Sequence, residues 1–214
     1  MREGQDAVMA GEGGASDVVF SRRIVIGGAG GHGVLVFGRL LALAGIRRYG
    51  EATFVPVYDP EIHGSPVNAF VIVSEKDIVA PVSNVYDIGV LFDHRSAHEH
   101  AGKVRADGLL VVNSSIVSSD FIVSTPTVWV PATAEALRLG NSRLSNMFML
   151  GAVLRATGLF TVDEIVHGLT EVLPAHRRDL IPQNVAAIEA GFSYADDLAA
   201  GSAEPRQPQV KRAG

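Results

Sequence analysis

The chain has 214 residues, of which 47% are hydrophobic and 7% aromatic, and its formal net charge is −5 at pH 7. This length suits one well-packed domain, and the aliphatic composition predicts a core like that of a buried sheet covered by helices. An acidic chain without a basic stripe is a poor partner for nucleic acid. The sequence has no cysteine, which excludes disulfides, thiolate zinc sites and cysteine-ligated iron–sulfur clusters within these residues.

The two ends of the chain differ in composition from its middle. Residues 1–21 and 196–214 are rich in Gly, Ala and charged residues and have no sustained periodicity. We therefore expect a flexible leader and a flexible tail around a single α/β domain over residues 22–195. No apolar run reaches the roughly 18 residues of a membrane span, and the first 19 residues lack the apolar centre of a secretory signal. These features predict a cytoplasmic protein without membrane contact.

In chain order, the pattern predicts a strand over 23–29, a glycine turn, and a helix over 34–44. Short apolar runs then predict strands at 52–58, 67–74, 88–93, 109–113 and 128–131. After residue 132 the periodicity is helical, with helices expected at 134–139, 146–156, 162–173 and 183–194. Thr161 and Glu164 have the spacing of a capping box before the third of these helices. The expected fold is a Rossmann-like open, mostly parallel sheet flanked by helices, with a helical C-terminal layer.

The glycine run between the first strand and the first helix is a candidate ligand site. The spacing Gly28-x-Gly30-x-x-Gly33 is typical of turns whose backbone approaches a diphosphate at a helix N-terminus. The alternative is a turn whose glycines serve packing alone. A dinucleotide site also needs an acid after the second strand. Asp59 is the nearest candidate, but it precedes Pro60, which favours a turn residue.

A second candidate is the polar loop over residues 58–66, which lies between two apolar strands and contains two prolines and a glycine. Ligands of open α/β sheets bind at the carboxyl ends of the strands, so this loop could face the glycine turn. The alternative is an ordinary crossover loop.

Two other polar clusters could also form sites. His94 and His98 lie four residues apart, close to His100, a spacing that a metal site could use. A solvated helix start is the favoured interpretation, and no metal site is predicted. Arg177 and Arg178 could contact an acidic partner surface, or form a solvated pair.

Taken together, the motifs resemble the gamma subunit of the thiamine-diphosphate- and coenzyme-A-dependent 2-oxoacid:acceptor (ferredoxin) oxidoreductase family. The resemblance runs from residue 23 to 194. It is carried by the glycine run at 24–33, the loop Tyr58-Asp59-Pro60-Glu61 with Gly64, the segment 78–81, Asp87, and the late motifs at 146–152, 157–159 and 184–191.

The chain departs from the family pattern at two places. His32 stands where the family usually has Gln, which adds a titratable ring near neutral pH. His63 stands where the family usually has Arg, and it can carry that charge only when protonated. These departures concern ligand affinity and substrate rather than fold.

The resemblance implies a subunit of a complex that converts a 2-oxoacid to an acyl-CoA and passes electrons to ferredoxin, or to a flavin or NAD subunit. It places thiamine diphosphate, Mg and iron–sulfur clusters on alpha, beta and delta-type partner subunits. It implies that this chain, inactive alone and able to form a homodimer, contributes to the coenzyme A side of the site. The alternatives are a scaffold subunit and a free-standing dinucleotide-binding oxidoreductase. No catalytic residue is assigned, and the 2-oxoacid is not specified. The cofactor-binding residues expected are Gly28, Gly30, Gly31, His32, Gly33, Glu61, His63, Gly64 and Ser65.

Overall fold

The computed structural model describes residues 19–59, 64–118, 121 and 123–200. Within them the strands are β1 (Ser21–Ala29), β2 (Glu51–Tyr58), β3 (Pro66–Ser74), β4 (Tyr86–Leu91), β5 (Val104–Asn113) and β6 (Thr127–Val130). The α-helices are α1 (Val34–Tyr49), α2 (His94–His100), α3 (Ala132–Arg138), α4 (Ser145–Thr157), α5 (Val162–Val172) and α6 (Ile181–Ala199). Short 3-10 helices occupy Ala101–Lys103, Ser142–Leu144 and Ala175–Leu180.

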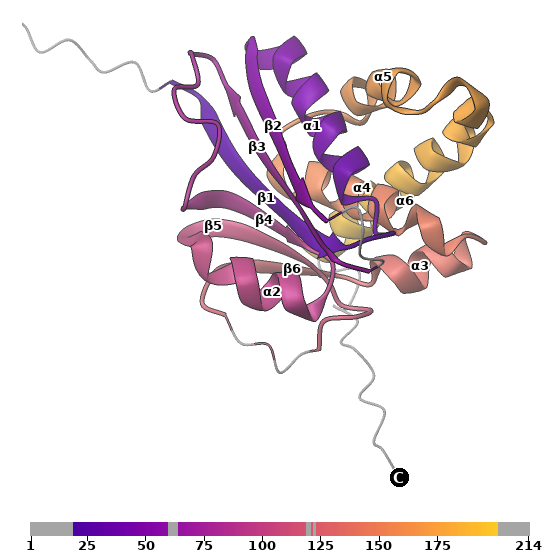
Figure 1. The fold of residues 1–214 in the computed structure, drawn as a ribbon. Coiled ribbons are helices and arrows are strands. Elements are labelled where there is room, and N and C mark those ends of the chain that lie inside the picture. Colours follow the sequence, from indigo (N-terminus) through magenta and orange to yellow (C-terminus); the bar gives the residue numbers. More distant parts are fainter. Residues whose placement is uncertain (1–18, 60–63, 119–120, 122, 201–214) are drawn as a thin grey trace, which may run out of the picture.

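The strands form one sheet in the order β2-β3-β1-β4-β5-β6 (Figure 1). β1, β4, β5 and β6 are parallel neighbours, whereas β3 runs antiparallel to both β1 and β2. The predicted open, mostly parallel sheet is therefore confirmed, with β3 reversed. The reversal makes β2 and β3 a hairpin, and this brings the loop between them back to the end of β1.

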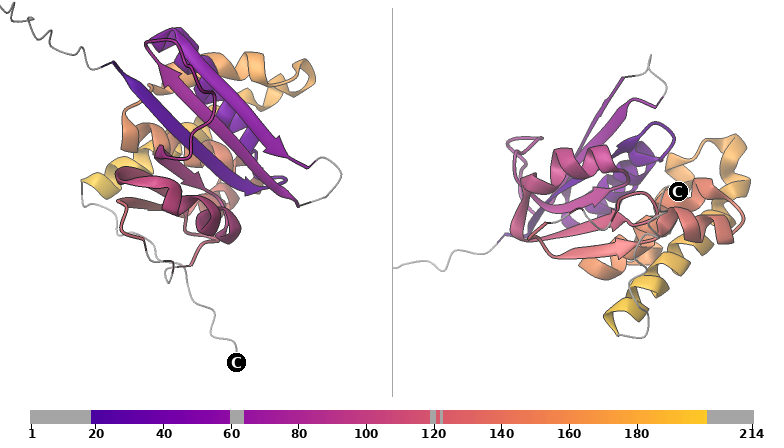
Figure 2. Two further views of the ribbon diagram at one scale, coloured as in Figure 1. Left: turned by 60° about the vertical axis from the view of Figure 1, so that its left-hand side comes forward. Right: turned by 90° about the horizontal axis from the view of Figure 1, so that it is seen from below.

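Helices cover both faces of the sheet (Figures 1 and 2). α1 and α4 contact one face, and α5 and α6 pack against those two helices. α2 lies on the other face, against β1 and β4. Ile24 and Ile26 of β1 face the larger core and Val25 the smaller one, and all three are fully buried. The predicted helical C-terminal layer is thus confirmed, and β1 is a central strand.

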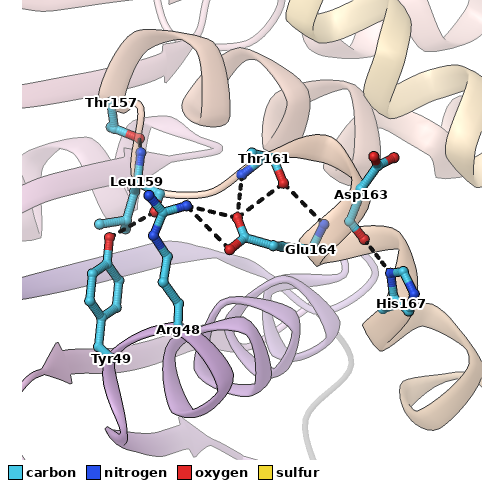
Figure 3. A network of polar contacts seen from close by, with 8 residues as sticks. All are labelled: Arg48, Tyr49, Thr157, Leu159, Thr161, Asp163, Glu164 and His167. Carbon is cyan, nitrogen blue, oxygen red and sulfur yellow. Dashed lines mark hydrogen bonds and ion pairs between the residues drawn. The ribbon is translucent and has the colours of Figure 1, made fainter.

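The predicted capping box at the start of α5 is confirmed. The Thr161 amide donates to Glu164 Oε2 at 2.7 Å, and the Glu164 amide donates to Thr161 Oγ1 at 3.3 Å. Arg48 at the end of α1 also pairs with this carboxylate, and Tyr49 Oη donates to the Leu159 carbonyl (Figure 3). Burial alone would raise the pKa of Glu164, but the bonds from Thr161 and Arg48 lower it overall. The network fixes the C-terminal end of α1 to α5.

Two glycines allow α4 and α6 to cross at close range. A Cβ on Gly151 would lie 2.7 Å from the Phe192 amide nitrogen and closer still to the Ile188 carbonyl oxygen. A Cβ on Gly191 would lie 2.7 Å from the carbonyl carbon of Phe148. Neither distance is possible for a real side chain, so each helix needs glycine opposite the backbone of the other.

The elements extend beyond the predicted ranges in several places. β5 begins at Val104 rather than 109, because its first half is exposed and polar and so lacks an apolar run. β1 begins at Ser21 and α6 continues to Ala199, beyond the predicted domain range. Most of the predicted leader and tail lies outside the described residues, so that division of the chain stays a prediction. Among the helices described here, none has the length and apolar character to cross a membrane.

Candidate functional site

The glycine turn joins the end of β1 to the start of α1. The His32 amide donates to the Ala29 carbonyl at 3.1 Å, which closes the turn, and Gly31 has a φ of 100° that favours glycine. Gly33 is the N-cap of α1, with a φ of 72°. It provides no side-chain cap, and within the described residues nothing accepts from the amides of the first helical residues. Within the described part of the chain, these amides of α1 are therefore donors without a partner.

His32 holds the turn together through its ring. Its Nδ1 accepts from the Ala29 amide at 3.0 Å, and the ring stacks on Phe92 with centroids 5.8 Å apart. Asp93 Oδ2 lies 3.6 Å from the same Nδ1. An Nδ1 that accepts a hydrogen bond belongs to the neutral tautomer that carries its proton on Nε2. His32 thus acts as a side chain that caps the turn, and Nε2 carries the remaining ring proton.

Two of the predicted glycines are needed for packing. A Cβ on Gly28 would lie 2.9 Å from His32 Nδ1 and 3.1 Å from Phe92 Cβ. A Cβ on Gly33 would lie 2.8 Å from Asn146 Cγ, which belongs to α4. The packing alternative therefore describes these two positions, whereas Gly30 and Gly31 between them have an exposed backbone.

The second loop lies against the glycine turn, as the sheet topology requires. The Gly30 amide donates to the Ser65 carbonyl at 3.1 Å, and Ser65 Oγ donates to the Asp59 carbonyl at 2.9 Å. Ser65 is buried and joins the two loops. Its bond to the Asp59 carbonyl connects the two ends of the second loop. Gly64 is exposed beside Gly30. Residues Glu61 and His63 lie outside the described residues.

The exposed backbone of the site is formed by Gly30, Gly31 and Gly64. A Cβ on Gly31 or Gly64 would meet nothing within 4 Å among the described atoms, and one on Gly30 would meet only Gly64, at 3.5 Å or more. The first turn of α1 carries no acidic residue, and its last turn carries two arginines. This arrangement leaves the helix N-terminus attractive to an anion.

The histidine cluster differs from the prediction at one position. His100, expected in a solvated helix start, is 1% exposed. Its Nε2 lies 2.9 Å from Asn68 Oδ1, whereas the His98 ring packs edge-on against Phe121. The cause is α2, which lies across the sheet and turns this face of the helix into the smaller core. No three His, Cys, Asp or Glu side chains in the described parts of the chain are grouped to hold a metal ion.

Sequence reasoning missed two residues that shape the site. Asp93 accepts from the Ser96 amide at 2.8 Å as the N-cap of α2, and it also faces His32. Asn146 lies against Gly33 with 7% of its surface exposed. The only signal for Asn146 was its place at the head of the motif over residues 146–152, and the sequence did not connect that motif with the glycine turn.

These features define an α/β protein of the class that presents a glycine turn and a helix N-terminus at the carboxyl end of a central strand. Residues 23–194 match the family described as pyruvate ferredoxin/flavodoxin oxidoreductase. The chain belongs to this family, and the resemblance predicted from its motifs is confirmed.

Proteins with similar sequences include subunits of enzymes that act on 2-oxoacids. Ketoisovalerate oxidoreductase subunit VorA of Methanothermobacter thermautotrophicus is 31% identical over 146 residues, which cover 67% of this chain and 30% of VorA. 2-Oxoglutarate synthase subunit KorC of Methanothermobacter marburgensis is 29% identical over 141 residues, 63% of this chain and 74% of KorC. The chain thus spans less than a third of VorA.

Solved structures share the fold. The gamma subunit of a keto/oxoacid ferredoxin oxidoreductase from Geobacter sulfurreducens superposes with a TM-score of 0.69 at 23% identity, over 85% of this chain and 98% of that one. A 2-oxoglutarate:ferredoxin oxidoreductase from Magnetococcus marinus gives a TM-score of 0.74 at 19% identity, over 88% of this chain and 33% of that one. The same fold therefore occurs both in a separate subunit and in part of a longer chain.

Proposed function

We propose that this chain is the gamma subunit of a multi-subunit 2-oxoacid:acceptor oxidoreductase and forms part of its coenzyme A site. The complex would convert a 2-oxoacid and coenzyme A to CO₂ and an acyl-CoA, and pass two electrons to ferredoxin or to a flavin- or NAD-linked subunit. Thiamine diphosphate with Mg²⁺, and the clusters, would lie on alpha, beta and delta-type partner subunits and supply bond cleavage and electron transfer. The complex would work in the cytoplasm, with the isolated chain inactive and able to form a homodimer.

The glycine turn is the observation that carries this proposal. The diphosphate of coenzyme A is an anion, and the free amides at the N-terminus of α1 are donors of the kind that bind phosphate. The exposed backbone of Gly30, Gly31 and Gly64 leaves room for a ligand at van der Waals distance. His32 fixes the turn, and its Nε2 can donate to a phosphate oxygen. These residues bind and orient the ligand, and we assign none of them a proton-transfer role.

Isolation of the complex tests the subunit assignment. The tagged full chain is recovered from its own cells, and the co-purified proteins are assayed with a panel of 2-oxoacids, coenzyme A and a viologen dye. We expect thiamine- and cluster-binding partners and dye reduction that depends on coenzyme A. A chain that is recovered alone and supports no such activity would contradict the proposal and favour a free-standing nucleotide-binding protein.

Charge at the turn tests the coenzyme A role separately. A side chain at Gly30 fits without a clash, so Gly30→Asp places a carboxylate beside the amides while the fold is kept. We expect the KM for coenzyme A to rise at least tenfold with little change in the KM for the 2-oxoacid. Gly102→Asp is the matched control, because Gly102 is exposed near α2 and a Cβ at this position would meet no atom within 4 Å. An unchanged KM for coenzyme A in Gly30→Asp would refute this role and leave a scaffold subunit.

A further inference from the structure

A pocket of about 300 Å³ opens beside the first turn of α1, between that helix and the N-terminal ends of α4 and α6. One side is apolar, with Leu144, Met147 and Leu173 among its residues, and the other is polar and basic. It adjoins the glycine turn, because Asn146 lines the pocket and also lies against Gly33. It is nevertheless separate from the exposed glycine backbone, since no residue of the turn lines it.

Asn146 lies between this pocket and the glycine turn. Its Oδ1 accepts from the Met147 amide at 2.9 Å, which directs the Nδ2 end toward Gly33. The residue as a whole is 7% exposed. Because Asn146 lines the pocket, its amide can donate a hydrogen bond to an acceptor bound there.

The charge of the pocket is positive. Arg143 and Arg177 both line it, and no Asp or Glu is among its lining residues. Neither guanidinium has an ion pair within the described structure, whereas five other arginines do. The first turns of α1, α4 and α6 carry no acidic residue and no side-chain cap. Each of these features favours an anion over a cation or a neutral ligand. The arginines with carboxylate partners are Arg47, Arg48, Arg105, Arg138 and Arg155.

We propose that this pocket binds a phosphomonoester. Such a group carries nearly two negative charges at pH 7 and three acceptor oxygens, which match two guanidinium groups and one amide donor. The inference rests on the proposed function for the identity of the ligand. Coenzyme A carries one phosphomonoester, the 3′-phosphate of its ribose, in addition to its diphosphate. With the diphosphate on the glycine turn, the pocket binds the 3′-phosphate, and its apolar side contacts the adenosine.

A comparison of ligands and variants tests this assignment. Coenzyme A, 3′-dephospho-coenzyme A and adenosine 3′,5′-bisphosphate are titrated into the full chain by isothermal calorimetry. We expect coenzyme A to bind at least tenfold more tightly than the dephospho form. Arg177→Gln and Arg143→Gln should each lower the affinity for coenzyme A about tenfold, as expected for the loss of a charge-assisted hydrogen bond. The affinity for the dephospho form should change less than twofold in either variant. Arg178→Gln is the matched control, because Arg178 bonds the Thr170 carbonyl and does not line the pocket.

The outcomes separate this inference from the proposed function. The proposed phosphate site would be refuted by equal affinities for coenzyme A and its dephospho form. It would also be refuted if Arg177→Gln weakened the binding of both equally, or if none of the three ligands bound. If Arg177→Gln removes the preference for the 3′-phosphate while Gly30→Asp leaves the affinity for coenzyme A unchanged, the phosphate site in the pocket is supported. The role of the glycine turn is then refuted. If Gly30→Asp weakens both coenzymes and the arginine variants change neither, the turn is supported and the pocket is refuted.

Discussion

The close crossing of α4 and α6 makes Gly151→Ala a sharp test of the fold. The new Cβ would lie within 3.0 Å of three backbone atoms of α6, a distance that real Cβ atoms essentially never show. Backbone atoms cannot rotate away, so the two helices must separate. The residues on either side of the crossing, Phe148 and Ile188, are 3% and 0% exposed, so separation also loosens the larger core.

The expected size of the effect follows from two opposing contributions. Overpacking costs about 1–3 kcal/mol and more where the obstacle is rigid, whereas Gly to Ala inside a helix returns up to about 1 kcal/mol. We expect a net loss of about 2 kcal/mol in the free energy of unfolding, which lowers Tm by roughly 4–8 °C for a chain of this size. Gly191→Ala should behave alike, and the double variant should lose less than the sum, because one separation relieves both clashes.

Urea denaturation and differential scanning calorimetry measure these changes. Gly102→Ala is the control, because its new Cβ would meet no atom within 4 Å and its φ is not positive. We expect that control to be neutral or stabilised by about 0.5 kcal/mol. If Gly151→Ala is as stable as the wild-type chain, the close helix crossing described here is incorrect.

Three further predictions concern polar side chains. Thr161→Ala should cost about 1 kcal/mol in urea denaturation, since it removes the hydroxyl from the capping box with Glu164; a change below about 0.3 kcal/mol would contradict that role. Burial lowers the pKa of His100 below its unfolded value of about 6.5, so the unfolded chain binds more protons and stability falls as pH drops below about 6.5. The slope should approach about 1.4 kcal/mol per pH unit and be smaller in His100→Gln, and equal slopes in the two proteins would refute this. His32→Ala should cost about 1 kcal/mol because the Ala29 amide loses its acceptor, and His32→Gln should recover part of that loss.

Local features of the chain predicted most of the fold. The β-branched runs predicted all six strands, the helical periodicity predicted α1 and the C-terminal helices, and the spacing of Thr161 and Glu164 predicted a cap that the structure contains. These succeeded because period, capping and turn chemistry act over a few residues. The same approach shortened β5, because residues 105–107 are exposed and largely polar, and because the register of β5 with β4 is irregular between the pairs Tyr86–Val104 and Ile88–Leu109.

The candidate site was predicted in part. The glycine turn and the second loop were expected to face each other, and the Gly30 amide does bond the Ser65 carbonyl. The roles within the turn were not predictable, because they depend on neighbours distant in sequence. Gly28 needs its lack of a side chain to accommodate His32 and Phe92, and Gly33 to accommodate Asn146.

The family, the α/β class and the position of the glycine turn follow from the amino-acid sequence alone, since motifs and periodicity are local properties of the chain. The three-dimensional packing was needed to show that β3 runs against its neighbours and that His100 is buried against Asn68. It was also needed to place Arg143, Asn146 and Arg177 around one pocket. The physical reason is that pairing, burial and the convergence of three helix ends depend on how distant segments pack.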